Sequence, residues 1–174
     1  MNETYDVIVI GAGAAGFMCA IEAGKRGRRV WLIDHSKKIA EKIRISGGGR
    51  CNFTNLHTKP ENYLSSNPHF CKSALHQYTQ NDFIKWVESH AISYHEKTLG
   101  QLFCDDSAND IINMLLKESQ ANGVQLDMET EVSCISKTAD GYEVTTSRGR
   151  AHSASLVIAT GGLSIPKIGA TKFG

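Results

Sequence analysis

The residues best placed to do chemistry are three glycines near the N-terminus, Gly11, Gly13 and Gly16, which form a Gly-x-Gly-x-x-Gly pattern. In this pattern the first glycine permits a tight turn, the second leaves room for a pyrophosphate, and the third lets a helix pack closely on a strand. The N–H groups that begin the helix then face the phosphates. Asp34 follows at a spacing suited to a ribose diol, and its charge disfavours the 2′-phosphate of NADP. These residues predict a dinucleotide-binding site, for either NAD or FAD.

A second glycine-rich segment, SGGGRCN at residues 46–52, places Arg50 and Cys51 directly after three adjacent glycines. Adjacent glycines weaken helices and strands alike, so we expect a loop that lets a ligand approach its backbone closely. Such a loop with one arginine suits phosphate cradling; the alternative is a disordered surface loop. Cys51 has no Cys-x-x-Cys partner, so we interpret it as structural rather than redox-active.

The elements that must position these segments begin with a βαβ unit. Apolar, β-branched runs over 7–10 and 30–33 predict strands buried on both faces of a parallel sheet, joined by a helix over 14–25. Residues 35–68 are irregular and polar. We then expect two short helices over 70–90, a strand over 92–95, a hairpin reaching residue 103, and a helix capped by Ser107 and ending near Asn122. After Gly123 the expected strands cover 124–126, 132–137, 142–146, 151–153 and 156–159.

Composition narrows the class of protein. The chain has 174 residues, of which 41% are hydrophobic and 21% charged, and its net charge is +1. This size fits a single domain, and the near-neutral charge argues against a nucleic-acid partner. The uncharged stretch over 7–21 is too short to span a bilayer and is broken by glycines, and no basic leader precedes it. Five cysteines without a paired spacing suit reduced thiols. We therefore expect a cytoplasmic protein with no membrane or metal partner, and leave its oligomeric state open.

Taken together, the motifs resemble those of one flavoprotein family. They are GAGAAG at 11–16, Asp34, Lys42, SGGGRCN at 46–52 with Thr54-Asn55, and ATGG at 159–162. The chain resembles the NAD(P)/FAD-dependent oxidoreductases described as HI-type flavoproteins and aminoacetone-oxidase-like proteins, some of which are described as reductases of unsaturated bile-acid ketones. The resemblance covers essentially the whole chain. It implies an α/β fold: a Rossmann-like FAD/NAD(P)-binding domain with a parallel central sheet and a small β-meander.

The resemblance also implies FAD as cofactor and a set of residues that contact it. The glycines at 47–49 would lie against its pyrophosphate, ribityl chain or flavin ring, and Arg50 would donate to an anionic or carbonyl oxygen. The backbone of Val132 would contact adenine, and LVIATGG at 156–162 would be a second FAD-contacting segment. The expected cofactor-binding residues are Gly11, Gly13, Ala14, Ala15, Gly16, Asp34, Lys42, Ser46, Gly47, Gly48, Gly49, Arg50, Cys51, Asn52, Thr54, Val132, Ala159, Thr160, Gly161 and Gly162.

The implied activity is hydride transfer from NAD(P)H to flavin N5 and then to a small organic substrate, with no catalytic acid or base assigned. Two positions depart from the family pattern: Lys172 stands where a glycine is expected after the SIP run at 164–166, and Cys104 replaces a proline. Because members of the family are much longer, we expect residues 1–174 to be an incomplete FAD-binding domain, a fragment lacking the substrate-facing domain and a final FAD segment. The alternatives are an NAD-only dehydrogenase domain, which leaves SGGGRCN unexplained, and a non-catalytic remnant.

Overall fold

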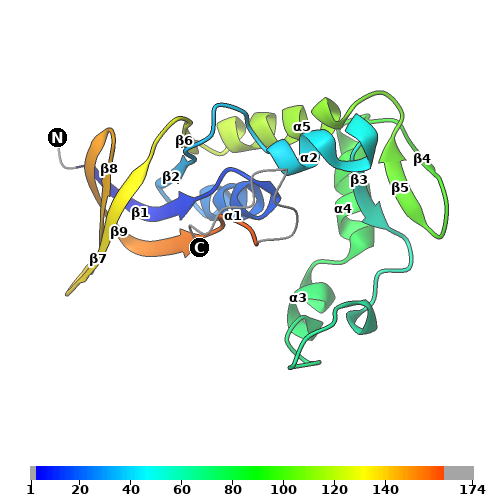
Figure 1. Ribbon diagram of the computed structural model, residues 1–174, viewed down its shortest axis with the longest axis horizontal. Coiled ribbons are helices and arrows are strands. Elements are labelled where there is room, and N and C mark those ends of the chain that lie inside the picture. Colours follow the sequence, from blue (N-terminus) through cyan, green and yellow to red (C-terminus); the bar gives the residue numbers. More distant parts are fainter. Residues whose placement is uncertain (1–2, 163–174) are drawn as a thin grey trace. The chain divides into compact units, whose positions relative to one another are not determined.

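The computed structural model describes residues 3–162 of the chain (Figure 1). Contacts between residues divide the chain into two compact units. The first unit comprises residues 1–42 and 115–174, and the second comprises residues 43–114. The chain therefore leaves the first unit once and returns to it once.

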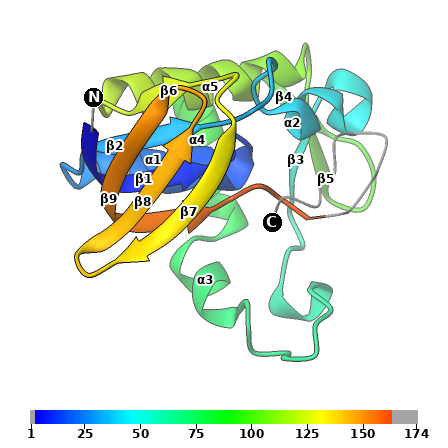
Figure 2. The ribbon, with the colours of Figure 1, turned by 60° about the vertical axis from the view of Figure 1, so that its left-hand side comes forward.

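The first unit is built on a six-stranded sheet in the order β6-β2-β1-β9-β8-β7. Its strands are β1 (Glu3–Ile10), β2 (Val30–Ile33), β6 (Gln125–Asp127), β7 (Val132–Thr138), β8 (Gly141–Thr146) and β9 (Gly149–Ile158). The four strands from β6 to β9 in this order pair in parallel. The chain then continues the sheet as the antiparallel meander β9-β8-β7 (Figure 2). This arrangement confirms the Rossmann-like fold, its parallel central sheet and the small meander.

Burial explains why the central strands are almost purely apolar. All four residues of β2 are buried, as are Ile8, Val9 and Ile10 of β1. Helix α1 (Ala14–Lys25) buries Phe17, Ala20 and Ile21. Strands covered on both faces need apolar side chains throughout, which is why the sequence predicts them well.

The second unit contains short elements around a three-stranded antiparallel sheet in the order β3-β5-β4. Its elements are the 3₁₀ turn η1 (Ser46–Gly49), β3 (Asn52–Asn55), the 3₁₀ turn η2 (Pro60–Asn62), α3 (Lys72–Gln77), α4 (Gln80–Ser89), β4 (Tyr94–Glu96) and β5 (Gln101–Cys104). Two helices, α2 (Glu41–Ile45) and α5 (Ala108–Ala121), include residues of both units.

Side-chain caps fix where two of the helices begin. The Thr79 hydroxyl accepts a hydrogen bond from the Asp82 N–H at 3.2 Å, while the Asp82 carboxylate accepts one from the Thr79 N–H at 2.8 Å. The Ser107 hydroxyl likewise accepts from the Asn109 N–H at the start of α5. Such reciprocal caps satisfy N–H groups that have no partner inside the helix. The predicted cap at Ser107 is confirmed.

Two predictions of local structure are wrong. Residues 35–68 contain α2, η1, β3 and η2 rather than an irregular stretch. These elements are short and polar, so they carry no apolar periodicity that a sequence pattern could detect. The two strands expected over 151–153 and 156–159 form one strand, β9, because it pairs with β1 along one edge and with β8 along the other. The expected SIP run and Lys172 lie outside the described residues.

Within residues 3–162, no helix is both long enough and apolar enough to cross a membrane. The same residues contain no cluster of three or more His, Cys, Asp or Glu side chains able to hold a metal ion.

Candidate functional site

The first glycine motif forms the turn between β1 and α1, and packing requires two of its glycines. Gly11 has φ +111°, and a Cβ there would lie 2.5 Å from the carbonyl oxygen of Ala159. A Cβ on Gly16 would collide with the carbonyl of Gly11. These two glycines therefore let the turn sit tightly between the helix and the end of β9.

Gly13 is different, because nothing lies within 4 Å of the place where its Cβ would be. It precedes the first residue of α1 and supplies no side-chain cap. Ala14 and Ala15, which follow it, are exposed. The first N–H groups of a helix have no intrahelical partner and carry a partial positive charge. The chain thus leaves an open space beside N–H donors, where a phosphate group fits.

Asp34 lies directly after β2, and its carboxylate ties two turns together. One oxygen accepts a hydrogen bond from the Ala12 N–H at 2.8 Å, and the other accepts from the Ser36 N–H at 2.8 Å. The side chain is 17% exposed. His35 Nδ1 also lies 3.4 Å from one of these oxygens. A carboxylate has about four acceptor positions, so at least one remains for a ligand hydroxyl.

The carboxyl end of β9 brings the ATGG segment to the same edge of the sheet. The Ala159 N–H donates to the carbonyl oxygen of Ile10 at 2.7 Å. Lys42 Nζ donates to the Gly162 carbonyl oxygen at 3.0 Å. The structure therefore places the first glycine turn, Asp34, Lys42 and residues 159–162 around the carboxyl ends of β1, β2 and β9. In α/β sheets this edge is where ligands bind.

Val132 begins β7, just after a segment held against Asp34. The Thr130 N–H donates to the Asp34 carbonyl oxygen at 2.9 Å. Sequence reasoning missed the arginine that holds this segment: Arg148 donates to the Thr130 hydroxyl at 2.8 Å, to the Met128 carbonyl at 3.1 Å, and pairs with the Asp127 carboxylate at 3.1 Å. No local spacing links Arg148 to these residues, so only the fold reveals the arrangement.

Asp127 is the charged centre of this arrangement. Its carboxylate accepts hydrogen bonds from the Trp31 indole N–H at 2.8 Å and from the Gln125 amide at 3.0 Å. Burial by itself would raise the pKa of Asp127, but these hydrogen bonds and the Arg148 guanidinium outweigh burial and lower the pKa. The segment before Val132 is thus fastened to both β2 and the β8–β9 turn.

The second glycine motif lies in the second unit and forms η1. Gly47, Gly48 and Gly49 have φ values of +59°, +68° and +90°. A Cβ on Gly47 would lie 2.6 Å from the Phe103 ring, whereas nothing lies within 4 Å of a Cβ on Gly48 or Gly49. Packing therefore explains the first glycine, and the other two leave left-handed backbone bare. Consecutive N–H groups in such a conformation form concavities that bind anions.

Hydrogen bonds hold the ends of this turn. The Ser46 hydroxyl donates to the Ile43 carbonyl at 2.8 Å, and the Cys51 N–H donates to the Ser46 carbonyl at 3.0 Å. The Arg50 carbonyl accepts from the Cys104 N–H at 3.0 Å, while the Arg50 side chain is exposed. Among the described residues, its guanidinium makes no hydrogen bond or ion pair, so it is available to a ligand.

The two cysteines beside this turn are buried. Burial raises the pKa of the Cys51 thiol, with a hydrogen bond involving Ser46 acting in the opposite direction. Burial also raises the pKa of Cys104, to about 12, with further contributions from Cys51 and nearby aspartates. Both thiols therefore stay protonated near neutral pH, which disfavours thiolate chemistry.

The predicted site residues thus fall into two groups, one in each unit. The first unit holds Gly11, Gly13, Ala14, Ala15, Gly16, Asp34, Lys42, Val132, Ala159, Thr160, Gly161 and Gly162. The second holds Ser46, Gly47, Gly48, Gly49, Arg50, Cys51, Asn52 and Thr54, the last two in β3.

Comparison with known proteins identifies the family. The model of the HI0933-like protein Rossmann domain matches residues 5–174. The chain belongs to this family. It is an FAD-binding Rossmann oxidoreductase family, and membership supports FAD as the cofactor. The family suggested by the sequence motifs is therefore confirmed.

The chain is also similar to relatives that have been named for their activity. Over 172 residues the chain is 54% identical to the ribosomal RNA dihydrouridine synthase of Escherichia coli K12, covering 99% of this chain and 43% of that protein. It is 47% identical to the enzyme of the same name from Haemophilus influenzae Rd, covering 100% and 44%. The 3-dehydro-bile acid delta(4,6)-reductase of Clostridium scindens is 24% identical, covering 92% and 40%. The chain spans less than half the length of these relatives.

Solved structures agree with the fold. A 3-ketosteroid-delta4-(5alpha)-dehydrogenase from Rhodococcus jostii RHA1 has a TM-score of 0.66 at 14% identity, covering 92% of this chain and 46% of that one. A flavocytochrome c3 fumarate reductase has a TM-score of 0.62 at 22% identity, covering 95% and 35%. At these identities the likeness shows the fold alone.

One expectation from the sequence is wrong. We expected a small-molecule substrate and no nucleic-acid partner, but two similar relatives carry names that state an action on ribosomal RNA. The expectation relied on the net charge of +1, which sums the whole chain. A summed charge does not report how cations are distributed over a surface, nor what neutral polar and aromatic side chains do.

Proposed function

We propose that this chain is the FAD-binding part of a flavoenzyme that forms dihydrouridine in ribosomal RNA. The observation that carries the proposal is the 54% identity to a ribosomal RNA dihydrouridine synthase over 99% of the chain. Dihydrouridine is uridine whose C5–C6 double bond has gained a hydride and a proton. Because ribosomal RNA is the substrate, we place the enzyme in the cytoplasm.

The residues present fit FAD. The open space at Gly13, which a Cβ would fill, lies beside the uncapped start of α1 and suits the pyrophosphate. The remaining acceptor capacity of Asp34 suits a hydroxyl of the ribose diol. Bound FAD supplies the two-electron chemistry, delivering a hydride in its reduced form, and NAD(P)H is the proposed reductant.

The remaining site residues orient the cofactor. The backbone of Val132 would contact adenine, and Arg148 holds the segment before it through Thr130. Lys42 stabilises residues 159–162 through the Gly162 carbonyl. The bare glycines of η1 and the unpaired Arg50 would donate to an anionic or carbonyl oxygen of the cofactor. In this proposal residues 1–174 act as an FAD-binding domain, and they span less than half the length of the relatives they match.

Cofactor binding is tested with the purified chain, incubated with excess FAD, desalted and measured by flavin absorbance. We expect the unaltered chain to retain flavin and Gly13→Ala to lose most of it, because the new methyl group occupies the pyrophosphate position. Gly13 has an ordinary backbone conformation, so its replacement costs at most about 1 kcal/mol of stability at a helix N-cap. Suppose instead that the chain stays folded, retains no flavin and quenches NADH fluorescence. That result would show that the cofactor is NAD rather than FAD.

Activity on RNA is tested separately. Ribosomal RNA free of dihydrouridine is incubated with the full-length enzyme, FAD and NADPH, and nucleosides are analysed by mass spectrometry. We expect a product two mass units heavier than uridine, and none without FAD. Failure to form it with a flavin-loaded enzyme would refute the RNA substrate while leaving FAD binding intact.

A further inference from the structure

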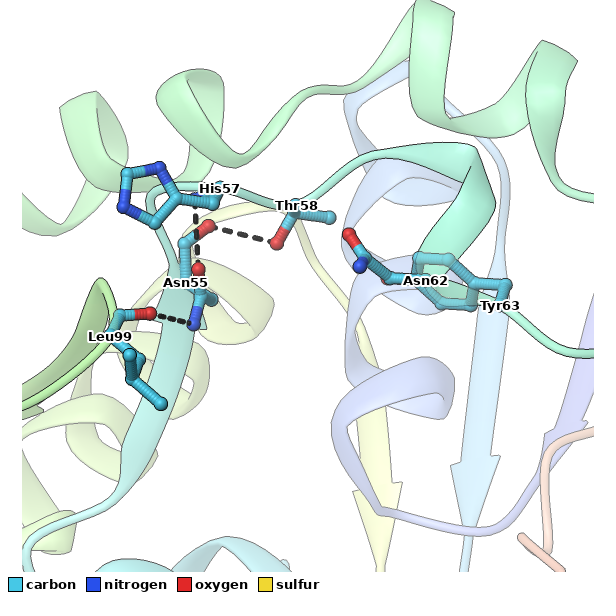
Figure 3. A pocket seen from close by; sticks show the side chains of 6 residues that line it. All are labelled: Asn55, His57, Thr58, Asn62, Tyr63 and Leu99. Atoms are coloured by element: carbon cyan, nitrogen blue, oxygen red, sulfur yellow. Dashed lines mark hydrogen bonds between the residues drawn. The ribbon is translucent and has the colours of Figure 1, made fainter.

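A cavity of about 370 Å³ lies in the second unit, and its lining begins shortly after the second glycine turn in sequence (Figure 3). It is lined by Asn55, His57, Thr58, Asn62, Tyr63 and Leu99. Figure 3 shows Asn55, His57 and Leu99 on one side and Asn62 and Tyr63 on the other. Its volume falls in the range of about 300–1,000 Å³ that is typical of small-ligand pockets.

Part of the lining is committed to internal hydrogen bonds. The Asn55 amide accepts from the His57 N–H at 2.8 Å and donates to the Leu99 carbonyl at 2.9 Å. The Thr58 hydroxyl donates to the Asn55 carbonyl at 2.8 Å. Both functional ends of Asn55 are therefore used, which holds one wall in a fixed shape.

Three side chains on the lining keep polar groups without an internal partner among the described residues. The Asn62 carbonyl oxygen accepts from the Lys59 N–H at 3.0 Å, but its NH₂ group has no acceptor. The His57 imidazole and the Tyr63 hydroxyl have no hydrogen-bond partner either. Amide, imidazole and phenol groups are the donors and acceptors that match the edge of a nucleobase, and the half-exposed Tyr63 ring offers a face for stacking.

The surroundings carry cations and further exposed rings. Lys59 is next to the lining residue Thr58 in sequence. Lys72 begins α3. The start of this helix is held near the lining, because the sulfur of Cys71 lies 3.7 Å from the Pro60 carbonyl oxygen. From 52 to 77 the sequence holds these two lysines and one acidic residue, Glu61. Phe70 is 80% exposed. Aromatic rings interleaved with cations are typical of surfaces that bind single-stranded nucleic acid.

We propose that this pocket holds one unpaired base of the RNA substrate, stacked on Tyr63 and hydrogen-bonded by Asn62 and His57. Lys59 contacts a neighbouring phosphate. The inference rests on the proposed RNA substrate and adds where the second unit binds it. None of the lining residues is among those assigned to FAD, although Asn55 directly follows Thr54 in β3.

The test measures RNA affinity by fluorescence anisotropy, using the full chain and a labelled single-stranded oligouridylate. Tyr63→Ala is expected to weaken binding roughly 5- to 100-fold, because a stacked base is lost. Tyr63→Phe keeps the ring and should bind within about threefold of the unaltered chain. Leu64→Ala is the matched control, since Leu64 is 97% exposed next to Tyr63 but does not line the cavity. It should leave affinity unchanged.

Each outcome separates the two proposals. If the unaltered chain binds RNA and neither Tyr63→Ala nor Asn62→Ala weakens binding, the base pocket is wrong and the RNA substrate stands. Equal losses of RNA affinity in Tyr63→Ala and Leu64→Ala would mean that RNA binds a nonspecific apolar surface rather than the pocket. If Tyr63→Ala and Leu64→Ala both lower the thermal stability of the chain while its RNA affinity is unchanged, another protein segment covers these two side chains. No RNA binding and no dihydrouridine formation would refute the substrate itself.

Discussion

At the scale of single residues, glycines in one motif have different reasons to be there. Gly11 and Gly47 are required by atoms that approach within 3 Å of a Cβ, whereas Gly13, Gly48 and Gly49 face open space. Packing accounts for the first pair, and the open positions are the ones where a cofactor can approach the backbone. A sequence motif alone does not separate these two roles.

We expect Gly11→Ala to lower the free energy of unfolding by at least about 2 kcal/mol, since strain at φ +111° adds to overlap with Ala159. Urea unfolding followed by circular dichroism measures the change. Gly149→Ala is the matched control, because Gly149 has φ +120° but no atom within 4 Å of its Cβ position. Equal losses in the two variants would mean that the Ala159 contact contributes nothing.

The cysteines should differ in reactivity in the native protein. Cys134 is exposed, whereas Cys51 and Cys104 are buried with raised pKa values. With Ellman's reagent at about pH 8, the exposed Cys134 should react quickly and the buried pair only on unfolding. Cys134→Ser should remove the fastest phase and leave the half-buried Cys19 and Cys71 to react more slowly. Rapid reaction of Cys51 in that variant would contradict its structural assignment.

At the scale of elements, the segment between β6 and β7 is fastened by polar contacts that span the sheet. Trp31 of β2, Gln125 of β6 and Arg148 of the β8–β9 turn all meet Asp127. Because the pKa of Asp127 is lower in the folded protein, its contribution to stability is full above the unfolded-state pKa of about 4. That contribution is lost as pH falls through the folded-state pKa.

Asp127→Asn should therefore lower the free energy of unfolding by about 1–3 kcal/mol at neutral pH. The difference from the unaltered chain should begin to narrow below about pH 4, where the carboxyl of the unfolded state is protonated, and should narrow further as pH falls through the lower folded-state pKa. Urea titrations across this pH range test both statements. Asp140→Asn, at an exposed turn position, should have little effect throughout. A constant difference across the pH range would show that charge on Asp127 does not matter.

How far the sequence predicted each element depended on the kind of signal it carries. The βαβ unit and Ser107 were predictable, because apolar runs and a cap are local features. Residues 46–62 were not, because η1 depends on left-handed glycines and β3 on pairing with a strand far along the chain. Arg148 and the Asn55 pocket arise from contacts between distant positions. The family motifs indicated FAD but not the proposed RNA substrate, which no glycine pattern encodes.

At the scale of the whole molecule, a net charge of +1 limits long-range attraction to RNA. Affinity in this proposal depends on a few lysines and on stacking. The logarithm of the binding constant should therefore fall only shallowly with the logarithm of salt concentration.

Lys59→Gln should reduce that slope by about 0.7, the value for one phosphate contact on a single strand. Anisotropy titrations from low to moderate salt measure it. Lys137→Gln in β7 keeps the same change in net charge at an exposed position of the first unit and should leave the slope unchanged. Equal changes in the two variants would indicate that only the summed charge matters.

The pairing of β1 with β9 has a consequence for biosynthesis. Glu3 pairs with Ala151 and Ile10 with Ile158, so one edge of β1 finds its partner only after almost all of the described chain has been translated. At about 5–20 residues per second, the nascent apolar strand waits on the order of ten seconds beside the ribosome. During that interval β2 can cover one edge, while the other remains open to chaperones. Ribosome-bound intermediates that end before β9 should therefore be protease-sensitive in β1.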